Sequence, residues 1–277
     1  MAQQPDLPRS ATEGIEPGVS ALIEAAPDGT PIGRRIVELL WDAPPPAARG
    51  RQPKVSVTQV VDAAIALADE EGFEALSMRS LARRLGVGAM SLYTYVPGKS
   101  ELFELMIDQA YRERPRPDPG LPWRRRYEEH ALAALAMYRR HPWLIHANLW
   151  RLPPGPSVFD ISEDLLVVGR DAGLPTEDGA RVSGLLESYV FGMARGEIAD
   201  RAQAARTGET SDDYWAARAA VWTRYFDPQR YPMLFATWQS GYWDGGDSEQ
   251  AERKFSLDLI LDGIERLVRQ AAAEGTR

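Results

Sequence analysis

Residues 76–106 read LSMRSLARRLGVGAMSLYTYVPGKSELFELM, and this stretch determines the fold that the sequence predicts. It holds two short segments, 78–85 and 89–95, which are separated by only three residues, Gly-Val-Gly. In each segment apolar residues recur every three or four positions, as they do in a helix with one buried face. A Pro-Gly pair closes the second segment, and the pattern then predicts a longer helix over 99–112.

A helix is also predicted immediately before this stretch. Ser56 and Gln59 have the spacing of a capping box, in which each side chain binds a backbone N–H of the other residue. Apolar residues then recur at helical spacing from Val60 to Ala68, and Gly72 follows where a helix is expected to end. These helices therefore form one unit, which we place at 55–112.

The unit has the arrangement of a helix-turn-helix, in which the second of two short helices enters the major groove of DNA. The whole chain carries a formal net charge of -8, which taken alone disfavours a nucleic-acid partner. The charge is unevenly placed, however, because no acidic residue lies between Glu74 and Glu101. A basic surface is therefore expected on this unit. The basic residues of the window are Arg79, Arg83, Arg84 and Lys99.

The quoted string is similar to the DNA-binding domain of the TetR family of bacterial repressors. The matching features are the Gly-ended first helix, the turn LARRLGVG, the helix SLYTYV and the lysine that begins the next helix. The segments SYVFGMARGE and LDLILDGIERLVR also resemble the dimerisation helices of the family. The resemblance implies an all-α chain, with a helix-turn-helix DNA-binding domain followed by a helical ligand-binding and dimerisation domain.

The resemblance further implies which residues contact DNA. Arg79 matches a position that reads a guanine in the Tet repressor, a member of the family, and an arginine reads this base through two hydrogen bonds. Leu92 and Val96 are expected to face the interior of the domain. The expected DNA-contacting residues are Ser77, Arg79, Ala89, Met90, Ser91, Tyr93, Thr94, Tyr95 and Lys99.

The helix over 89–95 has no arginine, asparagine or glutamine, so its base readout is expected to use hydroxyl groups and apolar contacts. Lys99, Ser77 and Tyr93 are expected to contact phosphates. Tyr93 and Tyr95 have the alternative interpretation of core aromatic side chains. Arg83 and Arg84 are expected to form a solvated face.

Residues 1–54 are expected to form a flexible extension with a basic arm. The first 30 residues are rich in proline, glycine, alanine and aspartate, and a short amphipathic helix is predicted over 32–41. Arg49, Arg51 and Lys54 then directly precede the first helix of the DNA-binding unit. Such an arm enters the minor groove, where narrowing concentrates negative potential, or it is a solvated linker that adds only non-specific attraction. Both interpretations stay open here.

The remainder of the chain is predicted to be helical as well. The expected helices lie near 123–140, 157–172, 178–204, 211–226 and 249–272. The absence of cysteine excludes disulfides and thiolate metal sites. No apolar run is long enough to span a membrane, and the N-terminus has no secretory pattern, so we expect a cytoplasmic protein without a membrane partner.

Residues 121–273 are expected to bind a ligand and to dimerise. Seven of the eight tryptophans lie after residue 120, and aromatic side chains often line apolar pockets in helical domains. Each of these aromatic residues has the alternative of an ordinary place in the core. The candidate ligand-binding residues are His130, Trp143, His146, Asn148, Trp150, Tyr189, Met193, Trp222, Phe226 and Trp238.

No metal or other cofactor is expected. His141 and His146 are five positions apart, which is not the spacing that places two ligands on one helical face. In the resemblance, Asn148 stands near the histidine that binds drug-bound magnesium in the Tet repressor, so the chain departs from that site. An enzyme is not expected either, because the sequence has no nucleophile motif, P-loop, GxGxxG or HExxH.

A homodimer is expected to form through 178–198 and 254–270, with a four-helix contact between subunits. The apolar residues assigned to this contact are Leu185, Leu186, Tyr189, Val190, Leu257, Ile260, Leu261, Ile264 and Leu267. The expected function is a repressor that binds a pseudo-palindromic DNA operator as a dimer and is released by a small hydrophobic or aromatic molecule, for example an antibiotic. The alternative is a DNA-binding regulator without a small-molecule ligand, which is controlled by a partner or acts as an activator.

Overall fold

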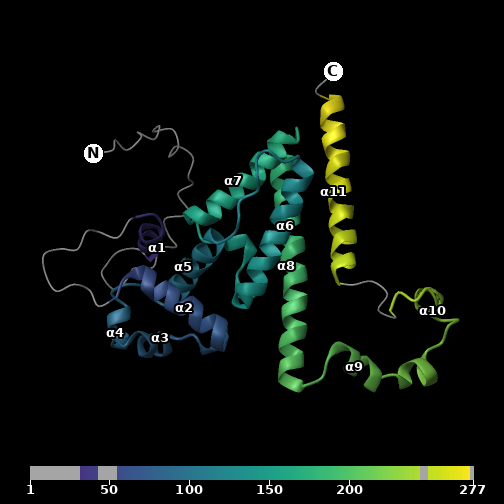
Figure 1. Ribbon diagram of the computed structural model, residues 1–277, viewed down its shortest axis with the longest axis horizontal. Helices are drawn as coiled ribbons and strands as arrows, with labels where there is room; N and C mark the ends of the chain where they lie inside the picture. The colour runs from purple at the N-terminus through teal and green to yellow at the C-terminus, as the bar shows by residue number, and fades with distance from the viewer. Residues whose placement is uncertain (1–31, 43–54, 244–248, 275–277) are drawn as a thin grey trace, which may run out of the picture.

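The computed structural model describes residues 32–42, 55–243 and 249–274, and within these ranges the chain is helical and has no strand (Figure 1). The predicted all-α fold is confirmed. The segment 1–30 and the basic residues Arg49, Arg51 and Lys54 lie outside the described residues.

The helix-turn-helix unit follows the predicted pattern closely. Ser56 and Gln59 form the predicted capping box, and Gly72, with a φ of 86°, ends the first helix. The apolar stripe from Val60 to Ala68 is buried. The elements of the unit are α2 (Val57–Glu71), η3 (Phe73–Ala75), α3 (Met78–Leu85), α4 (Ala89–Leu92) and α5 (Lys99–Arg112).

The C-terminal helices form a second layer beside α5 (Figure 1). The long helix α8 packs against both α6 and α7. A Cβ atom on Gly169 of α7 would lie 3.1 Å from the Cα atom of Gly179 on α8, so glycine permits this close approach. The elements of this layer are α6 (Trp123–Arg140), η4 (Pro142–His146), η5 (Leu149–Arg151), α7 (Pro156–Asp171), α8 (Thr176–Thr207) and α11 (Glu249–Glu274).

The prediction of a single helix over 211–226 was wrong. The chain forms α9 (Ser211–Ala217), a π-helical turn η6 (Val221–Tyr225) and then α10 (Pro232–Gln239), which the sequence reasoning missed. The side chain of Arg218 donates a hydrogen bond to the Tyr214 carbonyl oxygen at 2.9 Å, which competes with continuation of the helix. We call residues 211–239 the aromatic arm. This segment extends away from the other helices in Figure 1.

The predicted N-terminal helix is present as α1 (Ile32–Trp41) and packs against α5. Ile36 is buried, and Leu39 and Leu40 pack on the core, as the amphipathic pattern predicted. The Trp41 indole donates a hydrogen bond of 2.7 Å to the Pro154 carbonyl oxygen, just before α7. The helix therefore contacts both α5 and the approach to α7.

A buried carboxylate fixes α5 to the start of α7. Asp108 is only 8% exposed, and its Oδ1 atom accepts hydrogen bonds from the backbone N–H groups of Ser157 and Val158, at 2.9 and 3.1 Å. These N–H groups belong to the first turn of α7 and have no partner within that helix. A carboxylate at this end of a helix also interacts favourably with the helix dipole.

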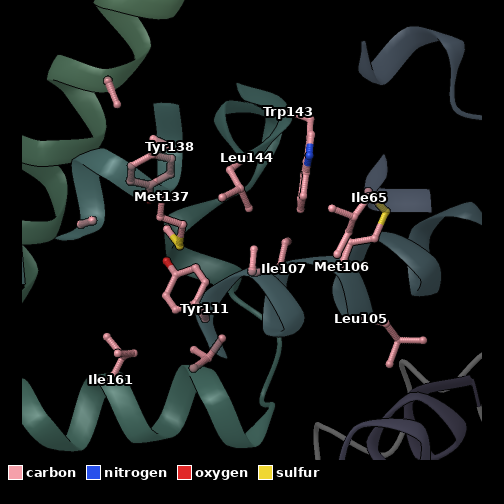
Figure 2. Close-up of a cluster of buried hydrophobic side chains, with 14 of the residues drawn as sticks. Ile65, Leu105, Met106, Ile107, Tyr111, Met137, Tyr138, Trp143, Leu144 and Ile161 are labelled. Carbon is pink, nitrogen blue, oxygen red and sulfur yellow. The ribbon is translucent and has the colours of Figure 1, made fainter. Parts of the chain in front are cut away.

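The helix-turn-helix unit also meets the C-terminal layer at Asp69, near the end of α2. The Trp143 indole donates a hydrogen bond of 2.7 Å to Asp69 Oδ1, and His141 Nδ1 lies 3.0 Å from the same carboxylate. His141 and Trp143 are both buried. Figure 2 shows Trp143 in one buried cluster with Ile65 of α2 and Met106 of α5. We call this contact the α2 joint.

We predict that Asp69→Ala lowers the free energy of unfolding by about 1–3 kcal/mol, because it leaves the buried indole N–H of Trp143 without an acceptor. The measurement is urea unfolding followed by circular dichroism. The matched control is Asp62→Ala in the same helix, whose exposed carboxylate has only a 3.5 Å contact with Gln109. Equal unfolding midpoints for the two variants would contradict the prediction.

Candidate nucleic-acid interface and effector domain

The helices α3 and α4 are held in place by a tight turn between them and by buried side chains in and just after α4. Gly86 ends α3 in the left-handed conformation, with a φ of 65°, and its N–H bonds to carbonyl groups of the last turn. A side chain at this φ is strained, so glycine suits the turn. Leu92 of α4 and Val96 just after it are fully buried, at 0% exposure, as predicted. The orientation of α4 is therefore set by its apolar face.

The opposite face of α4 is open to solvent. Met90 is 79% exposed and Tyr93 is 45% exposed, which excludes a core position for Tyr93 in this structure. Ser91 and Thr94 are also exposed, whereas Ala89 and Tyr95 are half-buried against the core. Four of the six residues predicted to contact DNA from this segment are therefore exposed, and Ala89 and Tyr95 are not.

The helix α4 is shorter than predicted, because it ends at Leu92 rather than at Tyr95. The Leu92 carbonyl oxygen accepts hydrogen bonds from the N–H groups of both Tyr95 and Val96, at 2.9 and 3.0 Å, which tightens the last turn. The Thr94 hydroxyl also donates to the Ser91 carbonyl oxygen at 2.7 Å. Local side-chain bonds of this kind compete with regular helix.

The arginines of α3 differ in their surroundings. Arg84 forms a 2.7 Å ion pair with Glu70, so it is tied to α2. Arg79 and Arg83 are exposed, and neither forms an ion pair with any residue that the structure describes. Arg79 lies in the first turn of α3 and Arg83 in its last turn. Arg79 therefore presents a free guanidinium from the helix next to α4.

The two predicted phosphate contacts that flank these helices already have protein neighbours. The Ser77 hydroxyl accepts a hydrogen bond from the Ser80 N–H at 3.0 Å and caps α3. The Lys99 ammonium lies 4.5 Å from the centre of the Phe73 ring, at the first residue of α5. Lys99 thus stands at a helix N-terminus, where free N–H groups favour an anion.

The predicted ligand-binding residues do not converge on one cavity. Trp143 belongs to the α2 joint, and the His146 ring stacks on Phe73 at 4.7 Å, also between the two layers. Asn148 caps η5, and Trp150 is 93% exposed. Tyr189 and Met193 lie half-buried on α8. The remaining residues, Trp222, Phe226 and Trp238, lie in the aromatic arm, where their ring contacts are with other rings of the arm.

His130 lies in a buried polar cluster that connects α5, α6 and α8. Its Nε2 atom is 2.5 Å from Glu187 Oε1 and 2.8 Å from Arg114 Nη2, and Arg114 also pairs with Glu187 at 3.1 Å. One imidazole nitrogen cannot donate to the carboxylate and accept from the guanidinium at once. Arg114 Nε and Nη1 and Glu187 Oε2 are buried without a hydrogen-bond partner. The cluster is thus incompletely satisfied.

The charges of this cluster follow from its contacts. Burial alone would raise the pKa of Glu187, but the adjacent Arg114 and His130 outweigh it and hold that pKa at about 2. Burial lowers the pKa of His130, so its ring is neutral. Sequence reasoning missed Arg114 because it lies in the Pro-rich stretch after α5. It lies two residues beyond the end of α5, so helical spacing gave no signal for its burial.

An open cleft of about 1060 Å³ lies elsewhere, between α1, α2, α5 and the start of α7. None of the predicted ligand-binding residues lines it. Asp42 and Val55, the residues on either side of the undescribed segment 43–54, both stand at its wall. The predicted ligand-binding residues therefore lie outside this cleft.

The predicted dimerisation residues divide between the interior and the surface. Several of them face the interior of the subunit, which corrects their assignment to an intersubunit contact; these are Leu186, Val190, Leu257, Leu261 and Ile264. Of the predicted residues, Leu185 on α8 is instead 53% exposed. Leu259 and Phe255 on α11, which were not among the predicted residues, are 58% and 64% exposed. The aromatic arm connects these two helices and exposes further large side chains, including Trp215, Trp238 and Met233.

Neither a metal cluster nor a membrane-spanning helix is found among the described residues. No group of three or more histidine, aspartate or glutamate side chains there is arranged to hold a metal ion. No described helix combines the length and apolar character that crossing a membrane requires.

Comparisons with known proteins agree with this architecture. The model for bacterial regulatory proteins of the tetR family matches residues 60–106, and the tetracyclin repressor-like C-terminal domain model matches residues 116–268. The HTH-type transcriptional repressor DrrR1 of Streptomyces coeruleorubidus is 39% identical over 244 residues, which cover 87% of this chain and 88% of that protein.

Solved structures give the same result. The crystal structure of ActR from Streptomyces coelicolor with actinorhodin has a TM-score of 0.64 and 27% identity, and covers 77% of this chain and 96% of that chain. The ActR complex with (S)-DNPA has a TM-score of 0.62 and 26% identity, with 77% and 98% covered. The matched models together span both helical layers. The chain therefore belongs to the TetR family of bacterial transcriptional repressors, with a Tet-repressor-like C-terminal domain.

Proposed function

We propose that this chain is a ligand-released repressor, which binds a pseudo-palindromic operator as a homodimer and leaves it when a small aromatic molecule binds. One observation carries the DNA-binding part of the proposal. The buried anchors Leu92 and Val96 fix α4, and its opposite face is exposed next to the unpaired guanidinium of Arg79. A side-chain set held on a fixed helix suits base readout.

We assign 55–112 to DNA binding and 121–273 to ligand binding and dimerisation. Within the extension 1–54, the basic residues Arg49, Arg51 and Lys54 add attraction to the phosphate backbone. Because the partner is genomic DNA, we place the protein in the cytoplasm. In this assignment Arg79 reads guanine, and Lys99, with the free N–H groups at the start of α5, binds a phosphate.

For DNA binding, we predict that Arg79→Ala weakens binding to the operator by about tenfold or more, since a bidentate contact to guanine is worth about 1–3 kcal/mol. The operator is first recovered by selection from random-sequence duplexes. Affinity is then measured by fluorescence anisotropy on that duplex and on duplexes with single guanines replaced.

The matched control is Arg83→Ala, which removes an equally unpaired guanidinium from the other end of the same helix. It is expected to lower affinity slightly and equally for all duplexes, because a phosphate-directed charge carries no sequence information. If Arg79→Ala keeps the wild-type preference for every guanine, the assigned role of Arg79 is wrong.

The effector part of the proposal rests on the family and on the buried polar cluster. ActR, a structural neighbour, crystallised with actinorhodin and with (S)-DNPA. In this chain Arg114 and Glu187 are buried with unsatisfied polar atoms, which cost about 1–3 kcal/mol each. A ligand group that satisfied them would favour the conformation it binds. Differential affinity of this kind shifts the population away from the DNA-bound state.

For effector release, we predict that an aromatic compound which quenches the tryptophan fluorescence also lowers operator affinity. Actinorhodin is the first compound to test, followed by other aromatic antibiotics. The expected change in operator affinity is about 5- to 150-fold, the usual range of allosteric coupling. A compound that binds the protein and leaves operator affinity unchanged would contradict the proposed release.

One observation favours the alternative of a regulator without a small-molecule ligand. The residues predicted to bind a ligand are spread over the α2 joint, the buried cluster and the aromatic arm, rather than around one cavity. If no compound of the panel binds while the operator does, control by a partner protein becomes the preferred interpretation. Operator selection separates this outcome from a failure of DNA binding.

The homodimer is proposed from large apolar side chains that are exposed on α8, α11 and the aromatic arm. Leu185 of α8 and Phe255 and Leu259 of α11 are more than half exposed, and the aromatic arm connects these helices. Apolar surface of this extent usually marks an interface. We therefore propose that α8, α11 and the aromatic arm pack on a second copy of the chain.

For the dimer, we predict a mass twice the 30.8 kDa of the chain in light scattering at micromolar concentration. The double variant Leu185→Glu with Leu259→Glu is expected to be monomeric, because two buried carboxylates would lose their hydration in the interface. Leu132→Glu, at an equally exposed position on α6, is the control and is expected to stay dimeric. A monomeric wild-type protein would contradict the proposed interface.

A further inference from the structure

The proposed recognition helix, α4, has few polar side chains that can bind base edges. Residues 87–98, VGAMSLYTYVPG, contain no charged and no amide side chain. The Thr94 hydroxyl proton is already donated to the Ser91 carbonyl oxygen at 2.7 Å. The hydroxyl groups of Ser91 and Tyr93 therefore remain as exposed donors on this helix. Most of what α4 offers to a base edge is apolar.

Met90 is the most exposed of these apolar side chains. It is 79% exposed, whereas Leu92 and Val96 in the same segment are at 0%. It occupies the second position of α4, and the first turns of a recognition helix are the part that contacts base edges. The side chain is unbranched and polarizable, so it adapts its shape to an apolar partner.

The major groove offers one apolar group at its base edges, the C5-methyl group of thymine. A methionine there cannot pair with the donors and acceptors of the other bases, and it would desolvate them at a cost. We propose that Met90 determines sequence specificity by packing on a thymine methyl group in each half of the operator. The inference rests on the proposed insertion of α4 into the major groove.

The test changes only that methyl group. In the operator recovered by selection, each thymine is replaced in turn by deoxyuridine, which keeps the base pair and removes the methyl group. We expect one position in each half-site where the replacement weakens binding of the wild-type protein by about fourfold, the equivalent of one buried CH₂ group. Replacement in both half-sites is expected to multiply the two effects.

Two variants assign the effect to Met90. Met90→Ala is expected to bind thymine and deoxyuridine operators equally well at that position, and Met90→Leu is expected to retain the preference for thymine. Leu132→Ala, which truncates an exposed apolar side chain on α6, is the control and is expected to discriminate as the wild type does. Thermal unfolding of Met90→Ala should match that of the wild type, because the side chain is exposed.

The outcomes distinguish a failure of DNA binding from a failure of the proposed role of Met90. If selection recovers no duplex, the proposed DNA-binding function fails and this inference fails with it. If an operator is bound but every deoxyuridine replacement is tolerated, the DNA-binding proposal stands and the role of Met90 is wrong. Continued discrimination by Met90→Ala at the sensitive position would also overturn the inference.

Discussion

The position of the helix-turn-helix unit depends on one carboxylate, Asp69, at the α2 joint. It accepts a hydrogen bond of 2.7 Å from the buried indole of Trp143, and His141 lies 3.0 Å away. A buried donor without an acceptor is costly, so the buried position of the Trp143 indole favours a geometry in which Asp69 accepts from it. Asp69 and Asp108, which fixes α5 to α7, thus join the two layers at two places.

The helix α5 connects the DNA-binding unit to the buried polar cluster. This helix begins at Lys99, beside the proposed DNA face, and runs toward Arg114 in the buried cluster with His130 and Glu187. The cluster is charged, buried and incompletely satisfied, whereas the α2 joint pairs its buried indole with a carboxylate. The structure thus places its least satisfied polar groups just beyond one end of α5 and its proposed DNA contacts at the other. The proposed coupling between ligand and DNA would act through this helix.

Local sequence signals predicted the helix-turn-helix unit well, because its geometry is set by neighbours in sequence. The capping box at Ser56 and the left-handed Gly86 are examples, since each acts within a few residues. The ligand-binding set was not predictable in the same way. Whether Trp143 meets Asp69 or a cavity depends on packing between residues 74 positions apart. Arg114 was missed because a charge in a Pro-rich stretch is normally exposed.

The distance between the two helix-turn-helix units of the proposed dimer gives the most direct test of the proposed coupling between ligand and DNA. The chain has no cysteine, so Arg83→Cys on the exposed side of α3 accepts a single spin label per subunit. We predict one narrow distance with operator bound, and a shifted distribution when an aromatic compound that binds the protein is added. The same distribution with and without that compound would contradict the proposed coupling between ligand and DNA.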